Sequence, residues 1–154
     1  MAVTELLHIS GEWHIKYNYT AGKIASRFLA ELRDNKRIVG TRCDKCKKVY
    51  VPPRGFCEEC FVPATEWVEV DNVGEIYSFT FGPRKLSAGL PEPFIIAYVR
   101  LNGADTCIAN FVKDIDMSDL NKLKEELFVG KKVQVKYEVK RKGLITDFYF
   151  CPYE

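Results

Sequence analysis

The order of apolar and polar residues divides the first part of the chain into an extended arm and a helix. From Trp13 to Tyr19, apolar side chains at odd positions alternate with polar ones at even positions. This period of two indicates a strand or an extended arm with one aromatic face. The apolar residues then change to helical spacing, which predicts a helix over residues 24–35. Its apolar face consists of Ile24, Ala25, Phe28, Leu29 and Leu32.

From residue 64 onward the pattern is typical of β-strands. Residues 67–70 and 75–81 are interpreted as one long strand, interrupted at residues 72–74 by a bulge or bend. The pair Asn102-Gly103 lies between two apolar runs and is typical of a hairpin turn. The pattern predicts four further strands, at residues 94–101, 106–112, 133–140 and 144–150.

A short helix is expected between the third and fourth of these five strands. Within residues 117–128, Leu120, Leu123 and Leu127 share one helical face. Asp116 or Ser118 can cap this helix, and Gly130 can end it. A five-stranded barrel with a helix between strands three and four is the OB-fold, and another small antiparallel β-barrel is the alternative.

The chain is therefore expected to be mainly β. We expect three regions: an N-terminal arm and helix over residues 1–39, a cysteine-rich segment over 40–63, and the OB-fold over 64–154. The cysteine-rich segment has few aliphatic residues and cannot bury enough apolar surface to fold unaided.

Four cysteines in this segment predict a metal site. Cys43, Cys46, Cys57 and Cys60 form two Cys-x2-Cys knuckles separated by ten residues. Two knuckles can place four thiolates around one ion, which suits structural Zn²⁺. A closed shell of four thiolates leaves no position for water or substrate, so we expect a structural role.

Three other uses of these cysteines are alternatives to zinc binding. Iron is the second choice, because rubredoxins use the same ligands. Lys47 and Phe61 stand where rubredoxin knuckles usually have glycine, which argues against electron transfer. Redox pairs and buried free thiols are further alternatives, but a redox pair usually opens a helix and the first knuckle is followed by a strand-like run. Cys107 and Cys151 lie in predicted strands and are read as inert buried thiols.

Basic residues mark candidate ligand sites. In an OB-fold, ligands usually bind beside the loop joining strands one and two and the loop joining strands four and five. The first loop carries Arg84 and Lys85, and the second carries Lys140, Arg141 and Lys142. These loops can hold phosphates, or they can be ordinary solvated turns.

Two more features allow a functional and a structural reading. Arg54 follows two prolines and can clamp a phosphate or pair with the thiolates. The aromatic arm, with Trp13, Tyr17 and Tyr19, can dock on a partner or pack on the protein's own helix. His8 and His14 have no ligand-like companion and are treated as structural.

Composition narrows the function classes. The chain has 154 residues, with 23 basic and 21 acidic residues and a net charge of +2, far from the strongly basic character of a dedicated nucleic-acid binder. The longest apolar run, residues 94–99, is too short to span a membrane, and no secretory signal is expected, so the prediction is a cytoplasmic protein. No common catalytic motif is present, so we expect that it is not an enzyme.

The cysteine knuckles and the barrel carry a resemblance to a known family. The stretch TRCDKCKKVYVPPRGFCEEC, followed by the barrel with Pro-Phe-Ile-Ile-Ala at residues 93–97, resembles thiolase-associated proteins with a rubredoxin-like zinc ribbon and an OB-fold. The resemblance implies a non-catalytic partner of thiolase-type or HMG-CoA-synthase-type enzymes in lipid or isoprenoid metabolism. It implies that the OB-fold helps to hold the coenzyme A moiety of acyl-CoA, with the four cysteines as metal ligands.

Two rival functions remain open from the sequence. A zinc ribbon joined to an OB-fold also occurs in proteins that bind single-stranded nucleic acid, and aromatic residues suitable for stacking are plentiful. A small iron-containing electron carrier is the other rival.

Overall fold

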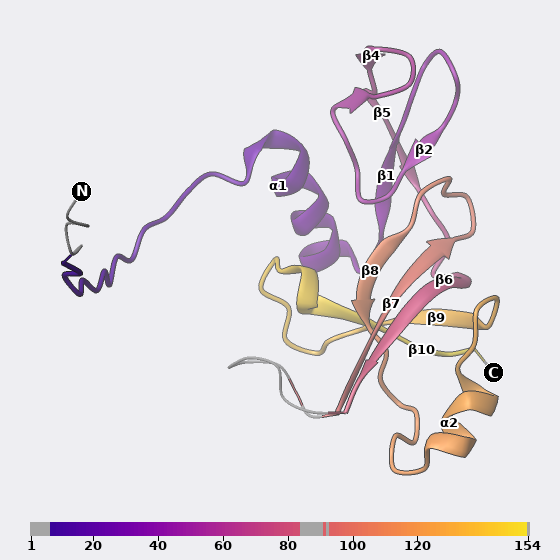
Figure 1. The fold of residues 1–154 in the computed structure, drawn as a ribbon. Helices are drawn as coiled ribbons and strands as arrows, with labels where there is room; N and C mark the ends of the chain where they lie inside the picture. Colours follow the sequence, from indigo (N-terminus) through magenta and orange to yellow (C-terminus); the bar gives the residue numbers. More distant parts are fainter. Residues whose placement is uncertain (1–6, 84–90, 92, 154) are drawn as a thin grey trace, which may run out of the picture.

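The structure is a computed structural model that describes residues 7–83, 91 and 93–153. An extended N-terminal arm leads into a helix, a small ribbon of short strands and a β-barrel (Figure 1). Arg84 and Lys85 lie outside the described residues. Among the described residues, no helix is long and apolar enough to cross a bilayer.

The predicted N-terminal helix is present and ends where expected. Helix α1 (Gly22–Ala30) continues as a π-helical turn, η1 (Glu31–Asn35). Lys36 follows with a φ of 51°, the left-handed conformation that commonly ends helices. Phe28 and Leu32 are buried, but Ala25, which was expected on the buried face, is exposed.

The cysteine-rich segment forms two small antiparallel sheets. Strands β1 (Val39–Arg42), β2 (Val49–Tyr50) and β5 (Glu66–Glu69) form one sheet in the order β2-β1-β5. Strands β3 (Phe56–Cys57) and β4 (Val62–Pro63) form the other. The expectation of one long strand was wrong at this point, because β5 pairs with β1 of the ribbon instead of continuing into the barrel. The division into three regions stays a prediction.

The barrel confirms the OB-fold. Its five strands are antiparallel neighbours in the order β10-β9-β6-β7-β8. A parallel bridge between Val112 and Phe150 joins the two outer strands, and the Lys113 amide donates to the Phe150 carbonyl at 2.8 Å. The strands are β6 (Val73–Gly82), β7 (Phe94–Leu101), β8 (Ile108–Phe111), β9 (Lys132–Tyr137) and β10 (Phe148–Pro152).

The connections between the last strands differ in detail from the sequence prediction. Helix α2 (Leu120–Glu126) lies between β8 and β9 as expected, but its cap is Asp119, whose Oδ1 accepts the Asn121 amide at 2.8 Å. Asp116 instead accepts from Ser118. Strand β9 ends at Tyr137, and a short 3-10 helix, η2 (Ile145–Asp147), replaces the predicted start of the last strand.

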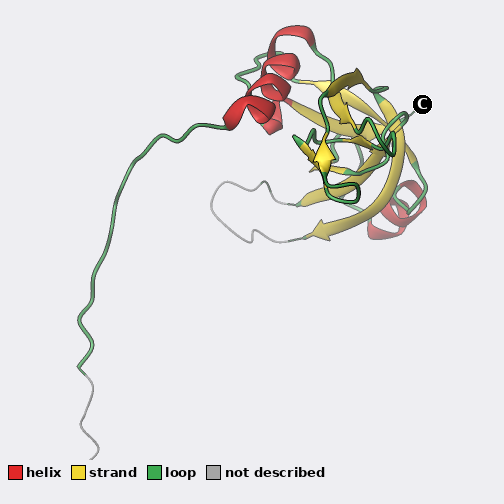
Figure 2. Ribbon diagram, turned by 90° about the horizontal axis from the view of Figure 1, so that it is seen from above, coloured by secondary structure: helices red, strands yellow, loops and turns green. Residues whose placement is uncertain are grey.

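One hydrophobic core runs through the helix, the ribbon and the barrel. It joins Phe28 and Leu32 of the helical segment to Val51 of the ribbon and to Ile76 and Phe148 of the barrel. Figure 2 shows the helix and the ribbon packed on one end of the barrel, with the arm extending away from all three. The ribbon is therefore held in a fixed position relative to the barrel by shared burial.

Hydrogen bonds add to this joint. The amide of Val49 donates to Asp105 Oδ2 at 2.8 Å, and the amide of Val51 donates to Thr106 Oγ1 at 2.7 Å. Thr106 also donates to the Val51 carbonyl. These bonds tie β2 to the turn between β7 and β8, so the edge of the ribbon sheet is paired with side chains of the barrel.

We predict that Gly74→Ala destabilises the barrel. A Cβ at Gly74 would lie 2.4 Å from the Arg100 carbonyl oxygen, and backbone cannot move aside cheaply. The expected loss is about 1–3 kcal/mol of unfolding free energy, measured by urea denaturation. Gly11→Ala is the control, because nothing lies within 4 Å of a Cβ there. Equal stability of the Gly74→Ala and parent proteins would contradict the close strand packing described here.

Candidate metal centre and lysine-lined pocket

Each cysteine pair forms a tight knuckle. The Lys47 amide donates to the Cys43 carbonyl at 2.9 Å, and the Phe61 amide donates to the Cys57 carbonyl at 3.0 Å. Lys47 and Phe61 have φ angles of 65° and 53°. The backbone of both residues therefore has the left-handed conformation for which glycine is the usual residue. The knuckle geometry is kept although neither glycine is present.

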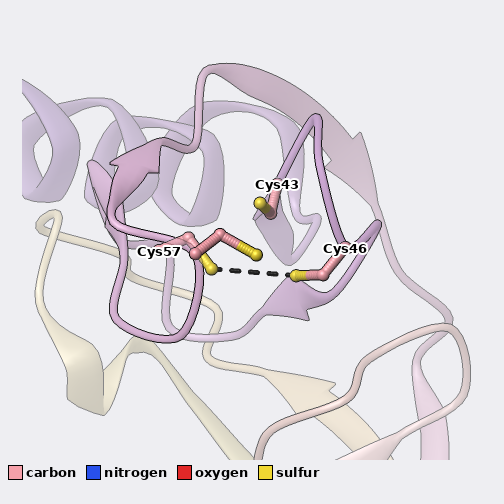
Figure 3. Close-up of side chains that lie close together, drawn as sticks. Cys43, Cys46 and Cys57 are labelled. Carbon is pink, nitrogen blue, oxygen red and sulfur yellow. Dashed lines mark hydrogen bonds between the residues drawn. The ribbon is translucent and has the colours of Figure 1, made fainter.

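The two knuckles bring the four sulfurs to one point. The sulfur atoms of Cys43, Cys46, Cys57 and Cys60 all lie within 4.8 Å of one another. Figure 3 shows the Cys43, Cys46 and Cys57 side chains directed toward a common centre, with Cys46 Sγ 3.7 Å from Cys57 Sγ. Tetrahedral Zn²⁺ with bonds of about 2.3 Å places its sulfurs roughly 3.8 Å apart. The donor set and its dimensions therefore fit a four-thiolate metal site.

The thiols of this site do not ionise equally. The Tyr50 hydroxyl lies 3.2 Å from Cys57 Sγ, and its hydrogen bond lowers the pKa of Cys57 to about 6. Burial raises the pKa of Cys60 to about 12. Four neighbouring thiolates repel one another, so a cation is needed to deprotonate the whole set. The cluster therefore has the electrostatics of a metal site, in which binding of the ion releases protons.

Arg54 and Lys48, two basic residues beside the site, are paired with carboxylates. Arg54 Nη1 lies 2.6 Å from Glu58, and Lys48 forms an ion pair with Glu59. The Arg54 guanidinium also lies 5.3 Å from the centre of the Tyr50 ring. The structure therefore places Arg54 over the tyrosine that contacts Cys57.

The backbone at Arg54 is fixed by Thr41. The Arg54 amide donates to Thr41 Oγ1 at 2.9 Å, and the same hydroxyl donates to the Arg54 carbonyl at 2.7 Å. Thr41 is fully buried. This pair of bonds holds the segment between the knuckles against β1.

A second candidate site lies on the barrel, where the loop between β9 and β10 approaches the end of the loop between β6 and β7. It is an open pocket of about 700 Å³, lined by Lys140 and Lys142 of the β9–β10 loop and by Pro91 of the β6–β7 loop. Lys113, which follows β8, completes the lysine lining and pairs with Glu138 at 2.6 Å. Within the described part of the chain, Lys140 and Lys142 make no ion pair.

Two buried polar residues fix the backbone beside this pocket. Asp147 Oδ2 accepts the amides of Lys142, Gly143 and Leu144 at 2.6–3.1 Å. Asn110 Nδ2 donates to the Ile145 and Phe148 carbonyls, both at 2.9 Å. These bonds fix the loop backbone, so the lysine side chains project from a rigid frame.

Arg141 has a different position from its two neighbours. Its Nε donates to the Arg33 carbonyl at 2.8 Å, and its Nη1 donates to the Glu138 carbonyl at 2.9 Å. It does not line the pocket, because these bonds direct its guanidinium to the end of the N-terminal helix. Arg141 therefore connects the helix to the barrel loop.

The aromatic arm has no packing partner among the described residues. Trp13, Tyr17 and Tyr19 are 84%, 76% and 83% exposed. Tyr17 and Tyr19 contact each other, with ring centres 6.2 Å apart. The arm is extended but belongs to no sheet, and the alternative that it packs on its own helix is wrong. A docking role stays a prediction.

Several residues of these sites were not found from the sequence. Tyr50 gave no signal as a thiolate partner, and Asp147 and Asn110 looked like ordinary strand residues. Lys113 follows β8, far along the chain from the loop lysines, and becomes their neighbour only when the barrel closes. Cys151 is buried as expected, whereas Cys107 is half-buried.

Comparison with known proteins matches the ribbon and most of the barrel to family models. Residues 30–66 match the family model of the ChsH2 rubredoxin-like zinc ribbon domain, and residues 67–138 match that of the ChsH2 C-terminal OB-fold domain. A probable enoyl-CoA hydratase alpha subunit of Thermomonospora curvata is 27% identical over 85 residues, which are 55% of this chain. The match spans only 27% of that longer protein.

Solved structures share the fold. A chain of the Ltp2-ChsH2(DUF35) aldolase superposes with a TM-score of 0.65 and 22% identity, covering 87% of this chain and 98% of that one. A DUF35-family protein of unknown function from Sulfolobus solfataricus gives a TM-score of 0.62 and 22% identity, covering 86% of this chain and 87% of that one.

We predict that the purified protein contains about one zinc ion per chain, bound by the four thiolates. Cys60→Ser should lose most of this metal and lower the stability of the ribbon, because a hydroxyl is a poor zinc ligand. Metal analysis with thermal denaturation checks both effects. Cys107→Ser is the matched control outside the cluster and should keep its metal. Iron in place of zinc, or full metal content in Cys60→Ser, would contradict the prediction.

Proposed function

The chain belongs to the ChsH2 family of proteins with a rubredoxin-like zinc ribbon and an OB-fold, and on this premise we propose that it is a non-catalytic subunit that holds the coenzyme A moiety of an acyl-CoA while docked on a thiolase-type or HMG-CoA-synthase-type enzyme. The lysine-lined pocket carries this proposal. Coenzyme A is a nucleotide with several phosphates, and a rigid loop that presents lysines is a suitable site for them.

The dimensions and charges of the pocket support the proposal. Its volume of about 700 Å³ lies in the range of small-molecule sites. Lys140 and Lys142 are exposed and free of ion pairs within the described residues, so their charges are available to a phosphate. Phe111 and Leu144 supply apolar surface beside them. A nucleotide needs this combination of cations and apolar contact.

The relatives support a role in acyl-CoA metabolism beside another enzyme. One relative is named as a subunit of a probable enoyl-CoA hydratase, and one structural neighbour belongs to an aldolase. The metal cluster has four protein ligands, so it leaves no open coordination position for a reaction. We infer that the chemistry resides in the partner enzyme and that this chain contributes binding.

The exposed arm is the surface we assign to partner docking. Trp13, Tyr17 and Tyr19 are among the residue types that contribute most to interface energies. The rings are exposed and the arm extends away from the barrel (Figure 2), so the arm can reach a second protein without moving the pocket. Ile15 lies between them in the same alternating pattern and is also exposed.

Coenzyme A binding tests the pocket. The double variant Lys140→Glu/Lys142→Glu should bind coenzyme A about tenfold or more weakly in calorimetry, because each substitution replaces attraction to phosphate with repulsion. Lys23→Glu on exposed helix α1 is the control and should bind like the parent. The proposal fails if the parent protein does not bind coenzyme A, or if a single-stranded oligonucleotide binds in its place with steep salt dependence.

Co-purification tests the arm. We expect a thiolase-type enzyme of the same source to co-purify with the tagged chain, and the triple variant Trp13→Ala/Tyr17→Ala/Tyr19→Ala to recover much less of it. The stability of the chain should not change, because these side chains are largely exposed. Recovery equal to that of the parent would remove the arm from the interface while leaving the coenzyme A result unaffected.

A further inference from the structure

A second hollow lies on a different part of the barrel, between helix α2 and the end of strand β6. Its volume is about 560 Å³. Phe79, Phe81 and Pro83 line it from the strand side. None of its lining residues belongs to the lysine-lined pocket, so the two are separate sites.

A bulge in β6 directs the two phenylalanines into this hollow. The register of β6 against β7 shifts between Ile76 and Ser78, so Tyr77 is the extra residue. Beyond the bulge, Phe79 pairs with Ala97 and Phe81 with Ile95, and both of these β7 residues are fully buried. Paired residues lie on the same face of a sheet, so the bulge keeps the phenylalanines on the inner face of the barrel.

Phe79 is nevertheless 38% exposed. An inward-facing aromatic side chain in a filled barrel is normally covered, because protein interiors are close-packed. The exposure shows that no side chain among the described residues fills the space beside it.

Helix α2 provides the opposite wall. Leu120, Leu123 and Leu127 recur at helical spacing and all line the hollow. Leu123 and Leu127 are buried and form its base, whereas Leu120 is 54% exposed at its edge. The apolar face of the helix is thus directed at β6 without closing on it.

One polar side chain lines the hollow. Lys124 is exposed and makes no ion pair among the described residues. An apolar cleft of this size with a single cation suits an apolar chain attached to an anionic group. A neutral apolar partner would gain nothing from the lysine.

We propose that this hollow binds the aliphatic chain of an anionic amphiphile, with the chain between α2 and β6 and the anion beside Lys124. A free fatty carboxylate and the chain of an acyl thioester share this chemistry. The inference does not depend on the lysine-lined pocket, because the two hollows have no lining residue in common.

Binding of dodecanoate to the full chain, followed by calorimetry, tests the proposal. Leu120→Glu should weaken binding about tenfold or more, because it places a carboxylate where the chain would lie. Leu120 is half-exposed and begins the helix, where an acidic residue is favourable, so the variant should fold. Val129→Glu is the matched control, since Val129 is 64% exposed and does not line this hollow.

A second pair of probes tests the role of the cation. Lys124→Glu should weaken dodecanoate about fivefold and leave dodecanol nearly unchanged, because only the carboxylate interacts with the lysine. The proposal is overturned if dodecanoate does not bind, or if Leu120→Glu binds it as well as Val129→Glu does.

Dodecanoyl-CoA identifies the source of the chain. If Leu120→Glu reduces its affinity to that of coenzyme A alone, the hollow holds the acyl group of the thioester. If Leu120→Glu weakens dodecanoate but not dodecanoyl-CoA, the hollow serves a separate fatty acid. Both results support the proposal. Failure of coenzyme A itself to bind would count only against the lysine-lined pocket.

Discussion

Four cysteine sulfurs within 4.8 Å of one another hold together a segment that has almost no hydrophobic core of its own. The small cluster around them contains Cys43, Tyr50 and Cys57 and little else. Residues of this kind cannot offset the conformational entropy of an ordered ribbon by burial alone. A metal ion bound by all four thiolates would supply that free energy and fix the positions of β1, β2 and β5.

The ribbon in turn packs against the barrel and the N-terminal helix. Val49 and Val51 of the ribbon pack in the large core. Asp105 and Thr106 accept hydrogen bonds from the amides of these two residues. Arg141 reaches from the barrel loop to the end of the helix. The metal site therefore affects residues that it does not contact. It stabilises the ribbon, and the ribbon and helix together support one end of the barrel and one of its loops.

The proposed functions use the surfaces of the barrel that the ribbon and the helix do not cover. The loop after β9 is fixed by Asp147 and Asn110, so its lysines are presented without a further ordering cost. The bulge at Tyr77 keeps Phe79 and Phe81 on the inner face of β6, and an apolar hollow lies between them and α2. A site for phosphates and a site for an aliphatic chain on one small barrel are the two parts that an acyl-CoA would need. The aromatic arm adds a surface for the enzyme that carries out the reaction.

The sequence alone determined the features that depend on local spacing. The doubled cysteine knuckle, the helix ending near Asn35, the hairpin turn at Asn102-Gly103 and the sequential order of the barrel's strands and helix were all readable, because each follows from the local pattern of residues. The tertiary structure decided the rest. Only strand pairing moves Glu66–Glu69 into the ribbon sheet, and only barrel closure brings Lys113 beside Lys142. The orientation of Arg141 away from the pocket and the apolar hollow beside Phe79 likewise depend on contacts between residues far apart in the chain. No local sequence pattern records such contacts.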